Sequence, residues 1–313
     1  MEKATQKTKS LFISVLGIPN VGKSSLTNSL VNSKVSIVSS KPQTTRNKIR
    51  GILTVDNSQI VFIDTPGLHN SKTHLGDYMI SEIYSSFSGT DACIHVIDAT
   101  KNITEYDKKF IKKFENLKIP VILAINKIDL LKDKTKLIEI MSEYSKLYNY
   151  DAIVPISAKT KNGKNDLMEE LLKLTKPSVF FFSEDDVTDQ TERTLVCEII
   201  REKLLWYLDK ELPHGIAVAV ERFFQKNENF ANIEATIYCE RENHKSIIIG
   251  KNGQMIKKVG TSARLELEKI LSEKINLNLW VKVKENWRNK DSILHNLGYI
   301  KENIIYSVTT LGS

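Results

Sequence analysis

A short glycine-rich segment that ends in lysine and serine is the first group of residues with a chemistry of its own. Residues 17–24 read GIPNVGKS and lie between an apolar, strand-like run at 11–16 and a helix-like run at 25–31. In that setting backbone N–H groups face phosphate oxygens, Lys23 reaches the β- and γ-phosphates, and the Ser24 hydroxyl ligates Mg²⁺. The dipole of the following helix adds partial positive charge. The pattern predicts a nucleoside triphosphate site, and a glycine-rich turn without a ligand is the alternative. The residues expected to form the site are Gly17, Ile18, Pro19, Asn20, Val21, Gly22, Lys23, Ser24 and Ser25.

A second segment, residues 64–67, follows the buried-strand pattern of residues 59–63. A carboxylate at this place can hold Mg²⁺ through water, and the N–H of Gly67 can meet a γ-phosphate. By itself the segment is a weak signal, since Asp64 could simply cap a turn. Its position one strand after the phosphate loop supports the phosphate interpretation. The predicted contacts are Asp64, Thr65, Pro66, Gly67 and Leu68.

Residues 126–129, NKID, follow another apolar strand pattern and indicate which base the site would take. The Asp129 carboxylate can accept two hydrogen bonds from guanine, one from N1–H and one from the 2-amino group. Adenine offers neither donor there and would leave the carboxylate unpaired. A further strand pattern leads into residues 157–159, SAK, whose backbone can donate to guanine O6. The predicted guanine contacts are Asn126, Lys127, Ile128, Asp129, Ser157, Ala158 and Lys159.

Four motifs at the ends of four successive strands place a ligand at the carboxyl edge of an open α/β sheet. This ordered set resembles the small GTP-binding proteins of the translation-factor class. The resemblance implies a threonine that closes on Mg²⁺ and the γ-phosphate, for which Thr44 and Thr45 are the candidates. Thr45, directly before Arg46, is the better match; a polar loop whose hydroxyls bond their own backbone is the alternative. The predicted switch residues are Gln43, Thr44, Thr45 and Arg46, and the predicted Mg²⁺ ligands are Ser24, Thr45 and, through water, Asp64.

One position departs from the pattern of Ras-type proteins, which place a water-orienting glutamine directly after the glycine that matches Gly67. Here that residue is Leu68, and an aliphatic side chain cannot orient water. Unaided hydrolysis is therefore expected to be slow, with a partner or a cation accelerating it; charge supplied at this step is worth about 10³–10⁵ in rate. By resemblance to related GTPases that lack the glutamine, Asn20 is a candidate ligand for a potassium ion. A side chain that only stabilises the loop is the alternative.

The composition suits a soluble protein of two domains. The chain has 313 residues, 41% of them apolar, and a formal net charge of +7. Three scattered cysteines are too few for a disulfide framework or a zinc site, and a reducing cytoplasm fits this usage. The N-terminal residues are basic without the apolar stretch of a signal peptide. No run reaches the roughly 18 apolar residues of a spanning helix, so we expect any membrane contact to be peripheral.

Charge and composition divide the chain near residue 180. Residues 184–240 hold 6 basic and 13 acidic residues, whereas residues 241–290 hold 12 basic and 5 acidic ones. An acidic face and a basic face within one domain suggest that the basic one takes phosphate. A helical pattern at 164–174 ends near Pro177, and a phenylalanine-containing, acidic stretch follows it. We expect a tail at 1–8, a nucleotide-binding domain at 9–177, a linker at 178–190 whose phenylalanines pack back onto a domain, and a second domain at 191–313.

The second domain contains a glycine motif of another kind. Residues 249–253 read IGKNG. A lone G-x-x-G is weak, but the surrounding pattern resembles a KH domain, whose loop clamps the backbone of a single-stranded nucleic acid. Gly250 and Gly253 let phosphate approach the backbone, and Lys251 adds charge; a helix–turn–helix connector without a ligand is the alternative. The predicted elements are a helix at 191–212, strands at 216–222 and 233–239, and an amphipathic helix at 254–271.

A last strand pattern at 277–284 alternates and places one aromatic and two cationic residues on the same side. Such a face suits base stacking and phosphate binding. Alternatively, Trp280 packs under a terminal helix predicted at 289–297 and the lysines are only solvated. The residues predicted to bind single-stranded RNA are Ile249, Gly250, Lys251, Asn252, Gly253, Lys257, Lys258, Trp280, Lys282 and Lys284.

Over nearly its whole length the chain resembles the Era family of bacterial GTPases. The segments that carry the resemblance are PQTTR at 42–46, DTPGL at 64–68, EIIREK at 198–203, IGKNG at 249–253 and LWVKVK at 279–284. The resemblance implies an α/β P-loop GTPase domain, with a mostly parallel sheet and helices on both faces, followed by an α+β type II KH domain with a C-terminal helix. It implies a Mg²⁺-dependent GTP-hydrolysing switch that binds the 3′ region of 16S ribosomal RNA and the 30S subunit and assists its assembly and maturation. Peripheral association with the inner face of the cell membrane is implied as well, and we expect a monomer.

Two other function classes fit less well. A tRNA-modifying GTPase shares Asn20 and Leu68 but usually lies within a larger protein that carries a cofactor-binding domain, for which this chain has no room. A switch in membrane-linked or cell-cycle signalling, with a C-terminal domain that binds protein, would leave the basic residues 241–290 without a purpose. Crosslinking in cells followed by sequencing of the attached RNA would separate the three.

Overall fold

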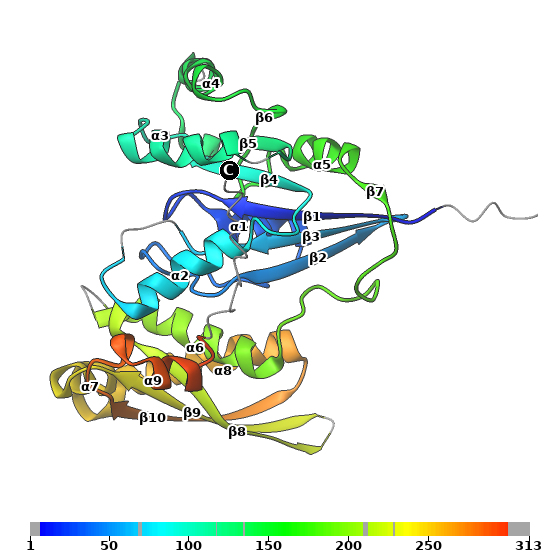
Figure 1. The fold of residues 1–313 in the computed structure, drawn as a ribbon. Helices are drawn as coiled ribbons and strands as arrows, with labels where there is room; N and C mark the ends of the chain where they lie inside the picture. The colour runs from blue at the N-terminus through cyan, green and yellow to red at the C-terminus, as the bar shows by residue number, and fades with distance from the viewer. Residues whose placement is uncertain are drawn as a thin grey trace, which may run out of the picture.

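Two β-sheets, one in each half of the chain, set the architecture of the computed structural model (Figure 1). The structure describes residues 7–67, 71–116, 118–133, 135–208, 212–227 and 229–299. Each sheet has its own hydrophobic core, and the helices that cover the smaller sheet lie between it and the first half of the chain.

The first sheet has seven strands in the order β2-β3-β1-β4-β5-β6, and a short seventh strand pairs with β1. Strands β3, β4 and β5 are buried along their whole length, as expected of parallel strands that are covered on both faces. Only β2 and β7 pair with their neighbours in the antiparallel sense. The strands are β1 Lys9–Leu16, β2 Ile49–Val55, β3 Ser58–Asp64, β4 Ala92–Asp98, β5 Val121–Asn126, β6 Ala152–Pro155 and β7 Lys176–Pro177.

Helices cover both faces of this sheet. Two of them, α1 and α5, contribute leucines to the core on one face, and α3 and α4 contribute to the core on the other. Local sequence sets where some of them begin: the Thr73 side chain accepts the N–H of Gly76 at the start of α2, and Thr104 forms a capping box with Asp107 at the start of α3. The helices are α1 Lys23–Val31, α2 His74–Ser85, α3 Glu105–Ile111, α4 Thr135–Leu147 and α5 Lys164–Lys173, with 3₁₀ turns η1 Lys112–Asn116 and η2 Ile128–Leu130.

The second sheet has three strands in the order β10-β9-β8, with β9 antiparallel to β8 and parallel to β10. Three helices pack on one face of it and build the second core. Within the described residues, no helix combines the length and the apolar composition needed to cross a bilayer. The elements are α6 Glu192–Tyr207, η3 Leu212–Gly215, β8 Ala217–Asn227, β9 Phe230–Cys239, α7 Glu242–Ile249, η4 Lys251–Gly253, α8 Gln254–Leu271, β10 Lys274–Val283, η5 Trp287–Asn289 and α9 Asp291–Asn296.

The segment between the two sheets does not cross open solvent but lies along the edge of the first sheet. Val187 accepts a hydrogen bond from the N–H of Ile52 at 2.9 Å, and Thr188 donates from its hydroxyl to the Arg50 carbonyl at 2.8 Å. The Phe181 ring meets Phe12 edge-on, with 5.0 Å between ring centroids. Phe181 therefore packs back onto the first sheet, as predicted for the phenylalanines of the linker.

Most predicted elements are present, with shifted ends. The helix predicted at 254–271 has the same bounds as α8, whereas the helix predicted at 191–212 ends at Tyr207 because Leu208 has an extended backbone. The hairpin β8–β9 is longer than predicted at its turn. Strand β2 was missed altogether: it is half-polar, and only its pairing with β3 shows it to be a strand.

Candidate functional site

The phosphate loop lies between the carboxyl end of β1 and the start of α1, as predicted. Two of its glycines have backbones that other residues rarely adopt, with φ of 150° at Gly17 and 97° at Gly22. A Cβ at Gly17 would lie 2.4 Å from the Val96 carbonyl oxygen, and one at Gly22 would lie 2.3 Å from Nδ2 of Asn126. Glycine is therefore required at both positions by the neighbouring strands as well as by the turn.

The Lys23 ammonium lies inside this loop. It donates to the carbonyl oxygens of Gly17 at 3.1 Å and Ile18 at 3.2 Å and is almost fully buried. Burial lowers the pKa of Lys23 to about 8, and the nearby Asp64 carboxylate acts in the opposite direction. A cation held by weak acceptors in a buried loop is suited to a ligand that brings strong negative charge.

Oxygen atoms suited to Mg²⁺ converge beside the lysine. The hydroxyls of Ser24 and Thr45 are 2.9 Å apart, and the Asp64 carboxylate at the end of β3 is fully buried. Burial raises the pKa of Asp64; the hydroxyls of Ser24, Ser36 and Thr45 and the Lys23 charge oppose that shift. No hydroxyl donates to the carboxylate with good geometry, so both of its oxygens lack a hydrogen-bond partner among the described residues. A buried, unpartnered carboxylate next to two hydroxyls fits a hard cation with oxygen ligands.

The segment after β3 forms one wall of the site through Gly67. The Thr65 hydroxyl donates to the Val15 carbonyl at 2.8 Å and fixes the turn. A Cβ on Gly67 would lie 2.8 Å from Cα of Pro19, so only glycine lets this backbone approach the phosphate loop. Pro66 lies between Thr65 and Gly67 in the same turn. Leu68 lies outside the described residues. A cleft of about 310 Å³ opens between the phosphate loop and residues 37–45, and Ser25 and the exposed Asn20 also line it.

The residues predicted to contact guanine meet at the ends of β5 and β6. Asn126 donates to the Val21 carbonyl at 2.8 Å and accepts from the N–H of Ala158 at 3.0 Å, which joins the phosphate loop to the residues after β6. The Ser157 hydroxyl donates to Asp129 at 2.6 Å and orients its carboxylate, which remains exposed. The backbone of Ile128 lies in the turn that carries Asp129, and Lys159 is exposed after Ala158. The structure therefore brings the predicted residues of both motifs together.

Sequence reasoning missed Asp98, at the end of β4. Its carboxylate accepts from Nζ of Lys127 at 2.6 Å, and the same ammonium donates to the Asn20 carbonyl at 2.7 Å. Burial acts to raise the pKa of Asp98, but hydrogen bonds from Lys127 and Thr100 outweigh it and lower that pKa. The available signal was a carboxylate at the carboxyl end of a buried strand, the place where parallel sheets hold ligands.

Residues 36–46, which we call the switch loop, carry the predicted switch residues. Gln43 has a left-handed backbone with φ of 58°, and the Thr44 hydroxyl bonds the Lys41 carbonyl rather than the cleft. Thr45 is the threonine that faces Ser24, in agreement with the preference stated for it. Arg46 points away from the cleft and is buried in the second half of the chain, where it donates to the Ile216 carbonyl at 2.7 Å.

The G-x-x-G motif joins α7 to α8 through the 3₁₀ turn η4. Gly250 has φ of 72° and a Cβ there would lie 2.7 Å from Cβ of Met255, whereas Asn252 adopts a left-handed backbone with φ of 51°. The side chains of Lys251 and Asn252 are exposed at the tip. Beside the motif, a groove of about 280 Å³ runs between α8 and β10, and none of the described residues that line it is acidic. Of the other predicted RNA contacts, Ile249 and Gly253 flank the tip, Lys257 lines the groove, and Lys258 lies over the Tyr207 ring.

The remaining predicted RNA contacts, Trp280, Lys282 and Lys284, do not lie in the groove beside the G-x-x-G turn. The alternation of β10 turns Leu277 and Leu279 toward the core and puts Trp280, Lys282 and Lys284 on the other face of the sheet. Trp280 is 45% exposed, so the terminal helix does not cover it, and that alternative is wrong. The Lys284 ammonium lies 4.3 Å from the centre of the Tyr238 ring. These three residues are therefore separate from the groove beside the G-x-x-G turn.

Comparisons with known proteins agree with this geometry. Residues 12–127 match the family model described as 50S ribosome-binding GTPase, and residues 211–288 match the KH domain model. The chain is similar to GTPase Era of Ruminiclostridium cellulolyticum, with 47% identity over 93% of this chain and 97% of the relative. It is similar to GTPase Era of Clostridioides difficile, with 44% identity over 93% of this chain and 98% of the relative.

Solved structures show the same likeness. One is Era in complex with MgGDPNP and nucleotides 1506–1542 of 16S ribosomal RNA, with a TM-score of 0.90, 37% identity, and coverage of 93% of this chain and 99% of that one. Another is a variant of Aquifex aeolicus Era bound to GDP and AlF4⁻, with a TM-score of 0.88, 36% identity and the same coverage. The predicted fold class, a P-loop GTPase domain followed by a KH domain, is confirmed.

Proposed function

The chain belongs to the Era family of GTPases, and from this we propose that it is a GTP-hydrolysing switch that binds the 3′ region of 16S ribosomal RNA and assists small-subunit assembly and maturation. One observation carries the proposal: a buried phosphate loop and a basic G-x-x-G groove lie in one chain whose fold matches that of an Era protein holding MgGDPNP and 16S nucleotides.

In the nucleotide half, the residues found together have distinct proposed roles. Lys23 and the backbone N–H groups of residues 17–25 would bind the phosphates, with Gly67 at the γ-phosphate. Asp129 would accept from the guanine ring, and Asn126 would hold the two halves of the site together through Val21 and Ala158. The backbone of residues 157–159 would face guanine O6.

Ser24 and Thr45 would ligate Mg²⁺ directly, and Asp64 would do so through water. When bound, the ion neutralises charge on the β- and γ-phosphates. The protein's own contribution is to keep the Asp64 carboxylate buried and without a hydrogen-bond partner among the described residues. A buried ionised carboxylate without a partner is unfavourable, so binding of a cation beside it is favoured. Potassium at Asn20 remains part of the proposal, since Asn20 lines the cleft with an exposed side chain.

In the second half, the G-x-x-G turn would clamp the backbone of single-stranded RNA, with Lys251 and Lys257 next to phosphate and bases in the groove between α8 and β10. Trp280 and the lysines beside it on the opposite face would make a separate stacking contact. We place the domain limits at 9–177 and 191–313, with the linker at 178–190; the separate sheets and cores support this division. A monomer that associates peripherally with the inner face of the cell membrane completes the proposal.

RNA titration tests this function. A labelled oligonucleotide with the 16S 3′-end sequence is titrated into wild type and into a variant carrying Lys251→Asp and Asn252→Asp, at two salt concentrations. The variant should bind at least tenfold more weakly, because it puts like charge against phosphate, and its GTP affinity should not change. Wild-type affinity should fall steeply with salt through counterion release.

A matched control carries the same change in charge at a distance. Lys132→Asp with Ser142→Asp, both exposed on the first domain, should leave RNA binding near the wild-type value. Equal binding by wild type and the Lys251/Asn252 variant would make the turn structural and remove the RNA half of the proposal. Flotation with vesicles of anionic lipid tests the proposed peripheral association with the membrane.

A further inference from the structure

The switch loop has no regular structure of its own to hold it in place. Residues 32–48 contain neither helix nor strand, yet several of them line the nucleotide cleft. Its beginning is held from within the first domain, where the Asn28 carboxamide accepts the N–H of Val35 and of Ser36, each at 2.9 Å. From Val38 onward the loop keeps the contact of Thr45 with Ser24 but is also anchored by residues of the other domain.

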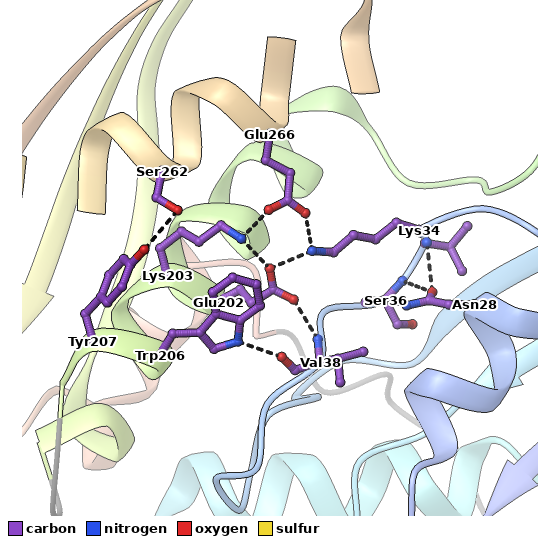
Figure 2. A network of polar contacts seen from close by, with 11 residues as sticks. Asn28, Lys34, Ser36, Val38, Glu202, Lys203, Trp206, Tyr207, Ser262 and Glu266 are labelled. Carbon is purple, nitrogen blue, oxygen red and sulfur yellow. Dashed lines mark hydrogen bonds and ion pairs between the residues drawn. The ribbon is translucent and has the colours of Figure 1, made fainter. Parts of the chain in front are cut away.

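Val38 is held on both sides by helix α6 of the KH domain (Figure 2). Its N–H donates to the Glu202 carboxylate at 2.8 Å, and its carbonyl accepts from Nε1 of Trp206 at 2.9 Å. Both backbone groups of a cleft-lining residue are thus satisfied by two side chains one helical turn apart. Val38 itself is on the rim of the cleft.

The anchors themselves are rigid. The Glu202 side chain is fully buried and accepts from Lys34 at 2.6 Å and Lys203 at 3.0 Å, and both lysines also pair with Glu266 of α8. The Lys203 ammonium lies 3.6 Å from the centre of the Trp206 ring. Two carboxylates and two ammonium groups therefore balance, and they fix the side chains that face Val38.

A second pair of anchors flanks the Mg²⁺-facing threonine. The Arg201 guanidinium donates to the carbonyl of Thr44 while Glu198 holds it in place. On the other side, Arg46 donates to the Ile216 carbonyl at 2.7 Å and the His214 carbonyl at 3.1 Å. Thr45 thus lies between two residues that are both fixed by the KH domain.

We propose that Trp206 and Glu202 of the KH domain are positioning residues of the nucleotide site, which hold the switch loop so that Thr45 faces Ser24 and thereby favour the triphosphate over the diphosphate. The inference rests on the proposed function, because it takes Thr45 as the residue that closes toward the γ-phosphate. Neither residue is among the described residues that line the cleft. By linkage, occupancy of the nucleotide site strengthens the contact between the domains to the same extent.

Trp206→Phe is the sharpest test. Trp206 is 49% exposed, so phenylalanine, which keeps an aromatic face for Lys203 but loses the N–H donor and part of the indole ring, should not prevent folding. Affinity for a non-hydrolysable GTP analogue should fall roughly 2- to 10-fold, the range for one neutral hydrogen bond. Affinity for GDP should change less than twofold, since the diphosphate does not need Thr45. Calorimetric titration of both nucleotides at fixed Mg²⁺, with thermal melts, measures this.

Phe224→Leu is the matched control, because that aromatic ring of strand β8 is also exposed in the same domain but is not bonded to the switch loop among the described residues. It should leave both nucleotide affinities at their wild-type values. A ratio of GTP-analogue to GDP affinity that is equal in wild type and Trp206→Phe would overturn the proposal. If wild type binds both nucleotides and RNA, that result leaves the proposed function standing; if wild type binds no guanine nucleotide, the proposed function itself fails.

Fluorescence gives a readout that does not depend on affinity. In the Trp280→Phe variant only Trp206 and the fully buried Trp287 emit. The GTP analogue should change the Trp206 emission more than GDP does, because the indole is bonded to a residue of the cleft rim. Identical spectra with the two nucleotides would count against the proposal, and adding Trp206→Phe should abolish the difference where it is seen.

Discussion

The phosphate loop and the switch loop line the same cleft, yet they are held in opposite ways. The phosphate loop is fixed by its own sheet: Lys23 bonds the carbonyls of its own turn, and Gly22 is packed against Asn126 of β5. The switch loop is held from Val38 to Arg46 by contacts with residues of the KH domain that lie more than 150 positions away in sequence. One side of the cleft is therefore held by its own domain and the other side by the KH domain, and the second side is the one through which the KH domain could act on the cleft.

Breaking the phosphate loop should have the largest effect. Gly22→Ala adds strain at φ of 97° and pushes a methyl group to within 2.3 Å of Asn126, which would lose its bond to the Val21 carbonyl. We expect a loss of about 3–4 kcal/mol in unfolding free energy, measured by urea denaturation, from strain plus an unsatisfied buried amide. Gly89→Ala, at φ of 77° with open space around it, is the control and should lose about 1 kcal/mol. Equal losses would show that packing against β5 is unimportant.

Breaking the anchor of the switch loop should come next. Arg46→Met leaves the carbonyls of Ile216 and His214 without their donor in a buried interface, which should cost about 2–3 kcal/mol in unfolding free energy. Arg50→Met serves as the control, since that guanidinium is 41% exposed in its ion pair with Asp189 and should contribute under 1 kcal/mol. Similar losses for the two variants would argue against a tight contact between the domains.

Comparing GTP turnover in sodium and in potassium tests whether hydrolysis needs a positive charge beyond those of the phosphate loop. With Leu68 in place of glutamine, turnover should be slow in sodium buffer and at least tenfold faster in potassium, or about 1.4 kcal/mol in the barrier. GTP turnover is compared in the two salts at matched ionic strength, and Asn20→Ala should lose the difference. Equal rates in the two salts would exclude Asn20 from the mechanism and leave a partner as the accelerator.

The smallest expected effect is a loss of unfolding free energy at low pH, which arises in the sheet that supports the phosphate loop. Burial among aromatic rings lowers the pKa of His95 in β4 from 6.5 to about 3. Below pH 6.5 the unfolded chain therefore binds a proton that the folded chain excludes, so stability falls as pH drops from about 6.5 toward 3. Between pH 7 and 5.5 this group should remove about 1 kcal/mol. Urea denaturation of His95→Phe should show a shallower pH dependence than wild type, and the exposed His295→Phe should not; a slope that His95→Phe leaves unchanged would contradict this account.

The residues that the sequence correctly placed together are those whose positions are set by the spacing of motifs along successive strands. Lys23, Asn126 and Asp129 are found together because motifs at successive strand ends must meet at one edge of a parallel sheet. Helix α8 was predicted with its observed bounds because amphipathic periodicity is a local signal. Strand β2 was not predicted because Arg50, Gly51 and Thr54 interrupt its apolar pattern, although its partner β3 follows after a two-residue turn. The role of Asp98 was not predicted because it depends on Lys127 at the end of another strand.

The contacts of the switch loop show most clearly what could not be predicted from the sequence. Nothing in the types of residues 38–46 indicates that Val38 would meet Trp206 or that Arg46 would lie under Ile216, because the bonds are to backbone groups that every residue carries. The two options for Trp280 could not be separated by alternation, which gives the same pattern for a covered and an open face. The exposed ring rules out cover by the terminal helix, and base stacking by Trp280 stays a prediction.

The path of the linker bears on how the first domain would behave if it were produced alone. Residues 187–188 occupy the outer edge of β2, and Gln59 of β3 accepts from the N–H groups of Phe181 and Phe182. A polypeptide that stopped at residue 177 would present an unpaired edge strand, which is a template for intermolecular pairing and aggregation. One that continued to residue 190 would keep the segment that covers this edge, so the unit suited to production alone is longer than the sheet that defines it.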